Sequence, residues 1–241
     1  ILQDPFSDAC FEHSKVLFWQ FTLVSEMQLE KLVTKFSRKS CDLDPIPATV
    51  LKEGLHDLIP VITKLVNISI TDAVVPSSLK NASLSPGLKK ENLTIPSQTC
   101  LLSRNVLKKV VATQLCHHLE DNNLNEVYQS TYKQYHSTET ALIKVQDDII
   151  REIDNNSCVI LLLLDLSAAF DTIDHQTLLH RLSHRFGIVD CALVWFRSYL
   201  SDRYQTVKVN GGVSSSRELL YGVPQGSVLG PILFLLEISA V

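Results

Sequence analysis

The chain has 241 residues, of which 45% are hydrophobic and 20% carry a charge. This composition is typical of a globular protein and excludes a chain that is disordered throughout. The formal net charge is −4, which is unusual for a free-standing nucleic-acid-binding domain. Between Lys80 and His118, however, six lysines and arginines stand against a single acid, Glu91. This local excess could contact phosphate, although a solvated helix face is the simpler interpretation.

Six cysteines stand at positions 10, 41, 100, 116, 158 and 191, and none belongs to a Cys-x-x-Cys pair. Such wide spacing favours reduced thiols over a disulfide framework or a zinc ribbon, so we expect an intracellular protein of the nucleus or cytoplasm that is not secreted. His180 and His184 have a spacing that can bind zinc, but no further ligand accompanies them and no zinc is expected. No apolar run is long enough for a membrane span, so no membrane partner is expected either.

The N-terminal third carries helix signals and no chemistry. Residues 1–24 hold no motif and are expected to form a poorly ordered terminal segment. A helix is predicted over residues 25–36, with Ser25 as its N-cap. Residues 49–72 place apolar side chains on a helical period that Pro60 interrupts, which predicts two helices or one kinked helix.

Helical patterns dominate the remainder of the chain as well. We predict helices over residues 105–120, 139–153, 175–185, 190–200 and 227–238. Gly187 is the stop signal between the third and the fourth of them. Residues 204–209 alternate, a turn signal follows, and residues 216–221 return, which predicts a hairpin. Three aromatic residues of the fourth helix are interpreted as core: Trp195, Phe196 and Tyr199.

The most informative stretch is an unbroken run of seven apolar residues, Cys158 to Leu164, which stops at Asp165. A run of this length that starts with Val and Ile predicts a strand buried on both faces, although periodicity alone does not exclude a short buried helix. A carboxylate at the end of such a strand is a common way to present an oxygen ligand to Mg²⁺. The simpler alternative is that Asp165 caps the helical turn that follows.

Three blocks of sequence carry a resemblance to a known family. Asp165-Leu-Ser-Ala-Ala-Phe-Asp-Thr-Ile-Asp-His175 is similar to the first palm motif of reverse transcriptases from non-LTR (LINE-type) retrotransposons. A second block resembles the next palm motif of the same family: Tyr221-Gly-Val-Pro-Gln-Gly-Ser-Val-Leu-Gly-Pro-Ile-Leu-Phe234. A third block resembles a fingers segment of the family: His136-Ser-Thr-Glu-Thr-Ala-Leu142. The blocks follow the family's order with comparable spacing. The similarity continues back through Ser40 to Pro47, so it covers about residues 20–241.

The resemblance implies the α+β fold class, with reverse-transcriptase fingers, an incomplete palm and a helix-rich N-terminal part. Residues 25–78 would form a helical N-terminal extension of the fingers, and residues 79–241 the fingers and partial palm. In the family, an Asp-Asp pair on a palm hairpin follows the second palm motif, and a thumb comes after it. Neither is found here, so we interpret the sequence as C-terminally truncated.

The family reaction adds a deoxynucleotide to a primer 3′-hydroxyl with the help of two Mg²⁺ ions. The resemblance assigns the catalytic, metal-binding carboxylate to Asp165 and a metal-binding carbonyl to Leu166. It places Phe170, Gln225 and Lys133 at the incoming dNTP, where the Phe170 ring would exclude a 2′-hydroxyl. Without the family, Phe170 reads as an ordinary core residue.

The resemblance also implies an RNA template and a DNA primer as partners, and it leaves the oligomeric state open. The residues it places against these strands are Pro224, Gln225, Gly226, Ser137, Thr138, Lys89 and Lys90. By local pattern alone, Ser137 or Thr138 caps the helix 139–153, and Gly226 belongs to a turn that caps the next one. Both roles are compatible, because a helix N-terminus is itself an anion site.

Two features separate this chain from the family. The Tyr-Arg-Pro-Ile-Ser-like motif that helps hold nucleotide phosphates is shortened to Pro96–Arg104, and the Asp-Asp pair is missing. Because one carboxylate cannot position two Mg²⁺ ions, we expect the isolated chain to be inactive. The alternative is a non-enzymatic retrotransposon remnant with at most weak nucleic-acid binding. A hydrolase with Asp165 as nucleophile is a weaker idea, because Ser167 stands where a second acid is usual.

Overall fold

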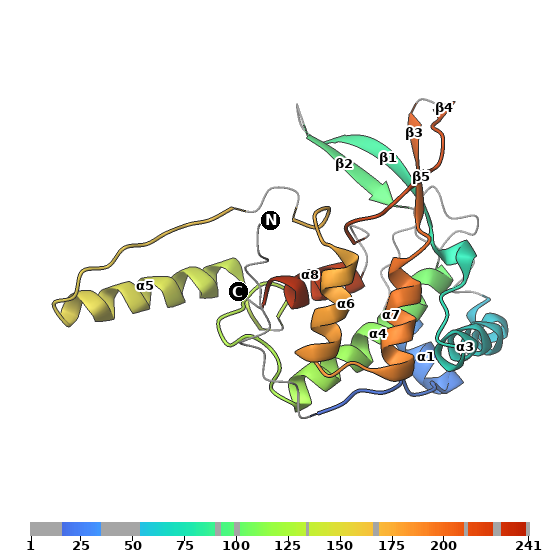
Figure 1. Cartoon of the computed structure of the whole chain (residues 1–241), viewed down its shortest axis with the longest axis horizontal. Coiled ribbons are helices and arrows are strands. Elements are labelled where there is room, and N and C mark those ends of the chain that lie inside the picture. Colours follow the sequence, from blue (N-terminus) through green and yellow to red (C-terminus); the bar gives the residue numbers. More distant parts are fainter. Residues whose placement is uncertain are drawn as a thin grey trace, which may run out of the picture.

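The computed structural model describes residues 16–34, 54–89, 93–98, 102–133, 135–165, 169–209, 212–223 and 228–239. Within these ranges the protein combines a body of packed helices with one small mixed sheet that rises above it (Figure 1). Helix and sheet together agree with the predicted α+β class. In the part of the chain that the structure describes, no helix is both long and apolar enough to cross a membrane.

The helical body buries one continuous apolar core. Helix α4 runs through it and contacts both α1 and α3 on one side and α8 on the other, while α6 packs on α7 and α8. Five apolar side chains of α4, which covers the helix predicted over residues 105–120, are all buried: Val106, Val110, Val111, Leu115 and Leu119. The helices of the body are α1 (Glu26–Thr34), α3 (Leu55–Thr71), α4 (Leu102–Asp121), α6 (His175–His184), α7 (Asp190–Leu200) and α8 (Leu229–Ile238).

Aromatic side chains form the densest part of this core. Trp195 and Phe196 are fully buried and Tyr199 is 1% exposed, as the sequence predicted. The Trp195 and Tyr199 rings stack with centroids 5.5 Å apart, and Phe21 meets Trp195 edge-on at 5.6 Å. The indole nitrogen of Trp195 donates to Ser69 Oγ of α3, so the buried polar atom is satisfied.

The expected looseness of the N-terminal segment does not hold for residues 16–24. Phe18 pairs with Ile188 in a parallel bridge, its N–H donating to Gly187 O at 2.8 Å. Farther along, the Val24 N–H donates to Asn67 Oδ1 at 2.9 Å. These bonds tie the segment to α3 and to the turn before α7. Residues 1–15 of the predicted segment lie outside the described residues.

Local signals placed the helices well. Ser25 and Gln28 form a capping box at the start of α1, with the Gln28 N–H donating to Ser25 Oγ and the Ser25 N–H donating to Gln28 Oε1. Pro60 stands inside a single helix, α3, so the chain does not divide into two helices at this proline. Gly187, predicted as a helix stop, has φ +65°, a conformation that favours glycine.

The sheet lies above the helices and was only half predicted. The expected hairpin forms from β3 (Tyr204–Val209), which pairs antiparallel with β4 (Gly212–Val213) and β5 (Arg217–Glu218). The second hairpin was not predicted. It consists of β1 (Asn81–Lys89) and β2 (Leu93–Gln98), in which Pro86 faces Pro96. Proline is rare inside strands, so the local pattern argued against them. A short 3₁₀ helix, η1 (Ser77–Leu79), leads into β1, which runs parallel to β3.

One part of the chain stands away from the body. Helix α5 (Thr138–Asp154) and the extended residues 155–165 that follow it project sideways as an arm (Figure 1). No residue of α5 is buried. Residues 158–165 are exposed and belong to no strand, so the predicted buried strand is wrong in this structure. A strand needs a neighbour for its backbone groups, and none of the described strands pairs with this stretch, so apolar character alone could not place it.

Candidate functional site

Two of the motif blocks meet in the structure although they are far apart in sequence. The Val223 N–H donates to Phe170 O at 2.9 Å, and the Gly222 N–H donates to Ile173 O at 2.8 Å. Asp174 and Tyr221 form an antiparallel bridge between the same two segments. We call residues 170–175 and 221–223, held together by these bonds, the motif junction.

Gly222 is the residue that allows this close approach. Its φ is +82°, and a Cβ placed on it would lie 2.9 Å from both Asp171 Cα and Phe170 O. Any larger residue would therefore push the two backbones apart. The carbonyl of Gly222 is also within 2.8 Å of His175 Nε2, which adds a side-chain bond to the backbone bonds.

Phe170 lies at the edge of the junction and packs against the core. Its ring centroid is 5.0 Å from that of Phe234 on α8, at an interplanar angle of 45°. The side chain is half-buried, so one part of it rests on α8 while the remainder is accessible. Core packing, the simpler sequence interpretation, is therefore present.

Asp174 is the N-cap of α6. Its Oδ1 accepts the Thr177 N–H at 2.7 Å. This hydrogen bond stabilises the charged carboxylate. Together with further hydrogen bonds at the start of α6, it lowers the pKa of Asp174. The carboxylate is thus committed to the helix terminus.

Asp165, the predicted catalytic residue, stands at the exposed end of the arm. Four other predicted site residues lie outside the described residues: Leu166, Pro224, Gln225 and Gly226. Within the described ranges, no group of three or more His, Cys, Asp and Glu side chains is arranged to hold a metal ion. A single exposed carboxylate does not fit a site for two Mg²⁺ ions, because the ions need shared oxygen ligands. His180 and His184 stack at 3.8 Å, and His184 Nδ1 lies 3.0 Å from His180 O.

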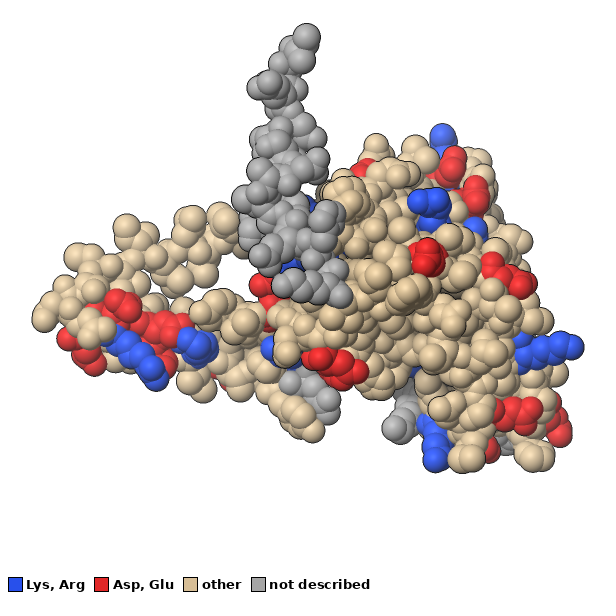
Figure 2. All heavy atoms as spheres, turned by 60° about the horizontal axis from the view of Figure 1, so that its bottom comes forward, with Lys and Arg blue, Asp and Glu red and all other residues tan. Residues whose placement is uncertain are grey.

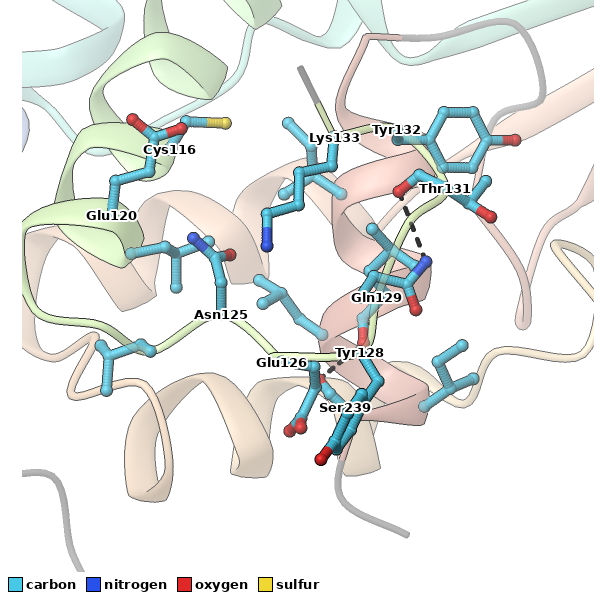
Figure 3. Close-up of a pocket in the computed structure, with 16 residues that line it drawn as sticks. Cys116, Glu120, Asn125, Glu126, Tyr128, Gln129, Thr131, Tyr132, Lys133 and Ser239 are labelled. Carbon is cyan, nitrogen blue, oxygen red and sulfur yellow. Dashed lines mark hydrogen bonds between the residues drawn. The ribbon is translucent and has the colours of Figure 1, made fainter. Parts of the chain in front are cut away.

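Lys133 lies on the wall of a cavity of about 610 Å³ between the C-terminal part of α4, residues 124–133 and the C-terminal half of α8. Its amine points into this cavity (Figure 3). Glu126 on the cavity wall is held by an ion pair with Arg185. Cys116 lies on the opposite wall, where burial, reinforced by Glu120, raises the pKa of its thiol. The sequence did not predict this cavity, because its walls come from three separate segments.

The hydroxyls predicted to meet the template begin α5. Ser137 is its N-cap: the Thr140 N–H donates to Ser137 Oγ at 3.2 Å, and the Ser137 N–H donates to Thr140 Oγ1 at 2.8 Å. The capping interpretation of Ser137 is thereby confirmed, and Thr138 is the first residue of the helix. Lys89 ends β1, and Lys90 lies outside the described residues.

Charge does not mark a nucleic-acid path on the face seen in Figure 2. Lysines and arginines there alternate with acids instead of forming one basic patch. On the arm the alternation is built from i,i+4 pairs, Lys144 with Asp148 and Arg151 with Asp147. The structure thus brings Phe170 to the second palm block, while Asp165 and Lys133 lie on separate parts of the molecule.

Comparison with known proteins shows which family the chain resembles. A family model described as reverse transcriptase (RNA-dependent DNA polymerase) matches residues 90–241. The chain is 26% identical over 203 residues to a probable RNA-directed DNA polymerase from transposon BS of Drosophila melanogaster, covering 82% of this chain and 22% of that protein. It is 27% identical over 161 residues to the corresponding X-element protein of the same fly, covering 67% and 16%.

A further relative comes from another insect. The chain is 37% identical over 71 residues to the Pol polyprotein from type-1 retrotransposable element R2 of Popillia japonica, covering 30% of this chain and 12% of that protein. The chain therefore spans about a fifth or less of the length of the curated relatives it matches. Because the family model covers more than half of its residues, the chain belongs to the reverse transcriptase family, in the company of non-LTR retrotransposon polymerases that its motifs indicated.

Proposed function

We propose that this chain is the fingers and part of the palm of an RNA-directed DNA polymerase, with residues 25–78 as a helical extension of the fingers and residues 79–241 as fingers and partial palm. The polymerase would copy an RNA template by adding dNTPs to a DNA primer. The observation that carries the proposal is the motif junction, which joins the two palm blocks by the Val223–Phe170 and Gly222–Ile173 bonds. These blocks are the ones that the family resemblance assigns to the polymerase site.

Asp165 would be the carboxylate that holds Mg²⁺, with the Leu166 carbonyl beside it. If further oxygen ligands completed the site, two Mg²⁺ ions held there would lower the pKa of the primer hydroxyl and neutralise the triphosphate. Phe170 would lie under the sugar of the incoming dNTP and exclude a 2′-hydroxyl, since Phe234 supports its ring from behind. Gln225 and Lys133 would contact the same nucleotide.

The template and primer would run past the start of α8 and the start of α5. Pro224, Gln225 and Gly226 follow directly on Val223, whose backbone is fixed at the junction, so their position is anchored on one side. Ser137 and Thr138 stand at the N-terminus of α5, where the free backbone N–H groups favour phosphate. Lys89 and Lys90 would add positive charge near the strands.

We also propose that the isolated 241-residue chain does not polymerise. The described residues place no second carboxylate with Asp165 in a cluster that could hold metal. Transition-state charge in phosphoryl transfer is stabilised by positioned ions, so one exposed carboxylate leaves this stabilisation incomplete. The remnant interpretation, in which the chain at most binds nucleic acid weakly, is favoured by the same observation.

Primer extension tests both statements. The isolated chain, given Mg²⁺, dNTPs and a DNA primer on an RNA template, should give no product above background. A chimera, in which residues 90–241 of this chain replace the matched segment of the transposon BS polymerase of Drosophila melanogaster, should extend the primer. Its extension should be lost with Asp165→Asn and kept with Asp171→Asn, another exposed carboxylate of the same block.

Each outcome of the primer-extension experiment tests a different part of the proposal. Extension by the isolated chain would refute its inactivity. A chimera that extends equally well with Asp165→Asn would remove the catalytic assignment of Asp165. A folded chimera that never extends a primer would favour the remnant.

A further inference from the structure

Helix α3 lies at the edge of the body (Figure 1), and its outer face carries apolar side chains that the described elements leave exposed. Val61 is 64% exposed and Ile68 is 50% exposed. Val74, in the loop after the helix, is 51% exposed. The inner face of α3 packs on α1 and α4 and buries Ile59 and Val66. The helix is therefore apolar on two faces, although the fold uses only one of them.

The exposed side chains line one groove of about 390 Å³. Its apolar lining consists of Val61, Leu65, Ile68, Val74 and Pro76. Three polar residues complete the lining. Ser69 is already bonded to Val74 O and to the Trp195 indole, whereas Lys64 and Asp72 add one charge of each sign. An apolar groove that also carries two opposite charges suits a partner surface of the same composition.

The two charges are placed symmetrically about Ile68. Lys64 lies four residues before it and Asp72 four residues after it, so the three side chains form one row along the helix, about 6 Å apart. Neither Lys64 nor Asp72 forms an ion pair within the described residues. Asp72 is also the C-cap of α3, and the last turn of the helix holds no basic residue. A carboxylate at this negative end of the helix dipole is stabilised by a cation from elsewhere.

We propose that α3 pairs antiparallel with α3 of a second copy of this chain, about a two-fold axis at Ile68. This axis brings Lys64 of each copy beside Asp72 of the other, because the two residues are equally far from it. It also packs Ile68 on its own symmetry mate and turns Val61 toward the partner's loop at Val74. A parallel pairing would instead bring Lys64 against Lys64 and place like charges together.

The size of the interface sets its strength. Helix α3 spans 17 residues, or about 25 Å, so two such helices bury less than about 1,200 Å² in total. Interfaces of this size form weak, transient complexes, and we expect a dissociation constant on the order of 10–100 µM. The ion pairs are exposed, so they contribute orientation more than affinity, which comes from the apolar row.

Charge reversal tests this arrangement. Sedimentation equilibrium of the full chain, at low salt and without nucleic acid, measures the dissociation constant of the dimer. Lys64→Glu alone and Asp72→Lys alone should each weaken it at least about tenfold, because each variant leaves two like-charged contacts. The double variant, Lys64→Glu with Asp72→Lys, should restore the wild-type constant, since it recreates both opposite-charge contacts.

The apolar row is tested with a matched pair of exposed valine and isoleucine sites. Ile68→Glu should abolish the dimer, because it places two carboxylates at the axis. Val213→Glu, at a site on β4 that is 60% exposed, should leave the dissociation constant unchanged. Urea unfolding of both variants checks that each is folded.

Single cysteines test the register. In a chain whose six native cysteines are changed to Ser, Ile68→Cys should give a disulfide between copies on mild oxidation, since the two Cα atoms would lie within about 7 Å. Lys64→Cys should not crosslink to itself, because antiparallel pairing holds the two copies of this residue about 12 Å apart along the helix.

A dimer that is restored by the double charge variant and crosslinked through Ile68→Cys supports the proposal. A chain that stays monomeric up to about 500 µM, well above the expected constant, would overturn it. So would a dimer that Ile68→Glu leaves intact, because the copies would then meet through another surface. Efficient crosslinking of Lys64→Cys to itself would refute the antiparallel register. The proposal does not depend on polymerase activity, and neither template nor dNTP enters these measurements.

Discussion

Glu237, on α8, is an acidic residue that is partly buried in the folded protein. Its Oε2 is buried and has no hydrogen bond within the described structure. Burial raises the pKa of Glu237, Arg181 opposes this rise, and Asp174 adds to it. The charged form is therefore less stable in the folded protein than in the unfolded chain, so this residue reduces stability at neutral pH.

Glu237→Gln should raise the free energy of unfolding at pH 7. The folded pKa lies above the unfolded value of about 4.3, so the folded state binds the proton more tightly, and stability falls as pH rises through that interval. The gain should disappear below about pH 4, where both states are protonated. Urea unfolding at several pH values measures it. Glu218→Gln, at an exposed site, is the control, and equal gains from both variants would contradict the account.

Two helices, α1 and α5, begin with the same kind of N-cap, but the two caps contribute differently to stability. Ser25 caps α1 and Ser137 caps α5, each through a reciprocal pair of bonds with the third residue of its helix. Helix α1 buries Leu29 and Val33 against the core, whereas α5 buries nothing. The same cap therefore supports global stability in one helix and only local order in the other.

Ser25→Ala should lower the global free energy of unfolding by about 1 kcal/mol, the usual value of an N-cap. Ser137→Ala should leave global unfolding unchanged and raise amide hydrogen exchange in α5 about fivefold, which corresponds to the same local loss. Denaturant titration and exchange mass spectrometry read the two effects. A global loss from Ser137→Ala would contradict this account and show that α5 packs against the body in solution.

The whole molecule depends on contacts between distant segments. The motif junction ties the stretch before α6 to the stretch before α8, and β1 pairs in parallel with β3 across more than a hundred residues of sequence. Helices α6 and α8 also pack directly, so the junction closes one end of a helix pair. Fixing this junction fixes where the second palm block can lie.

Gly222→Ala should lower the free energy of unfolding by about 1–3 kcal/mol, the cost of a strained backbone position. The added Cβ would meet the backbone of residues 170 and 171 at 2.9 Å, and φ is +82°. Gly54→Ala, at φ −89°, should change stability by less than about 0.5 kcal/mol. Thermal and urea unfolding compare the variants, and a neutral Gly222→Ala would show that the junction is not tight.

The features that could be predicted from the amino-acid sequence are those encoded within a few neighbouring residues. The positions of the helices, the caps at Ser25 and Ser137, the stop at Gly187 and the core role of Trp195 all follow from local patterns. The motif blocks likewise identified the family, because their residue types stand in one short order. The predicted roles of Asp165, Lys133 and Phe170 remain predictions.

How distant segments meet could be learned only from the folded protein. It joined Gly222 to Ile173, paired β1 with β2 despite Pro86 and Pro96, and formed the cavity of Lys133 from three segments. It left residues 158–164 exposed and outside the described strands. An apolar run indicates that burial would stabilise a segment, but it does not indicate which other segment buries it. That choice depends on long-range partners for its backbone and side chains, which no local pattern contains.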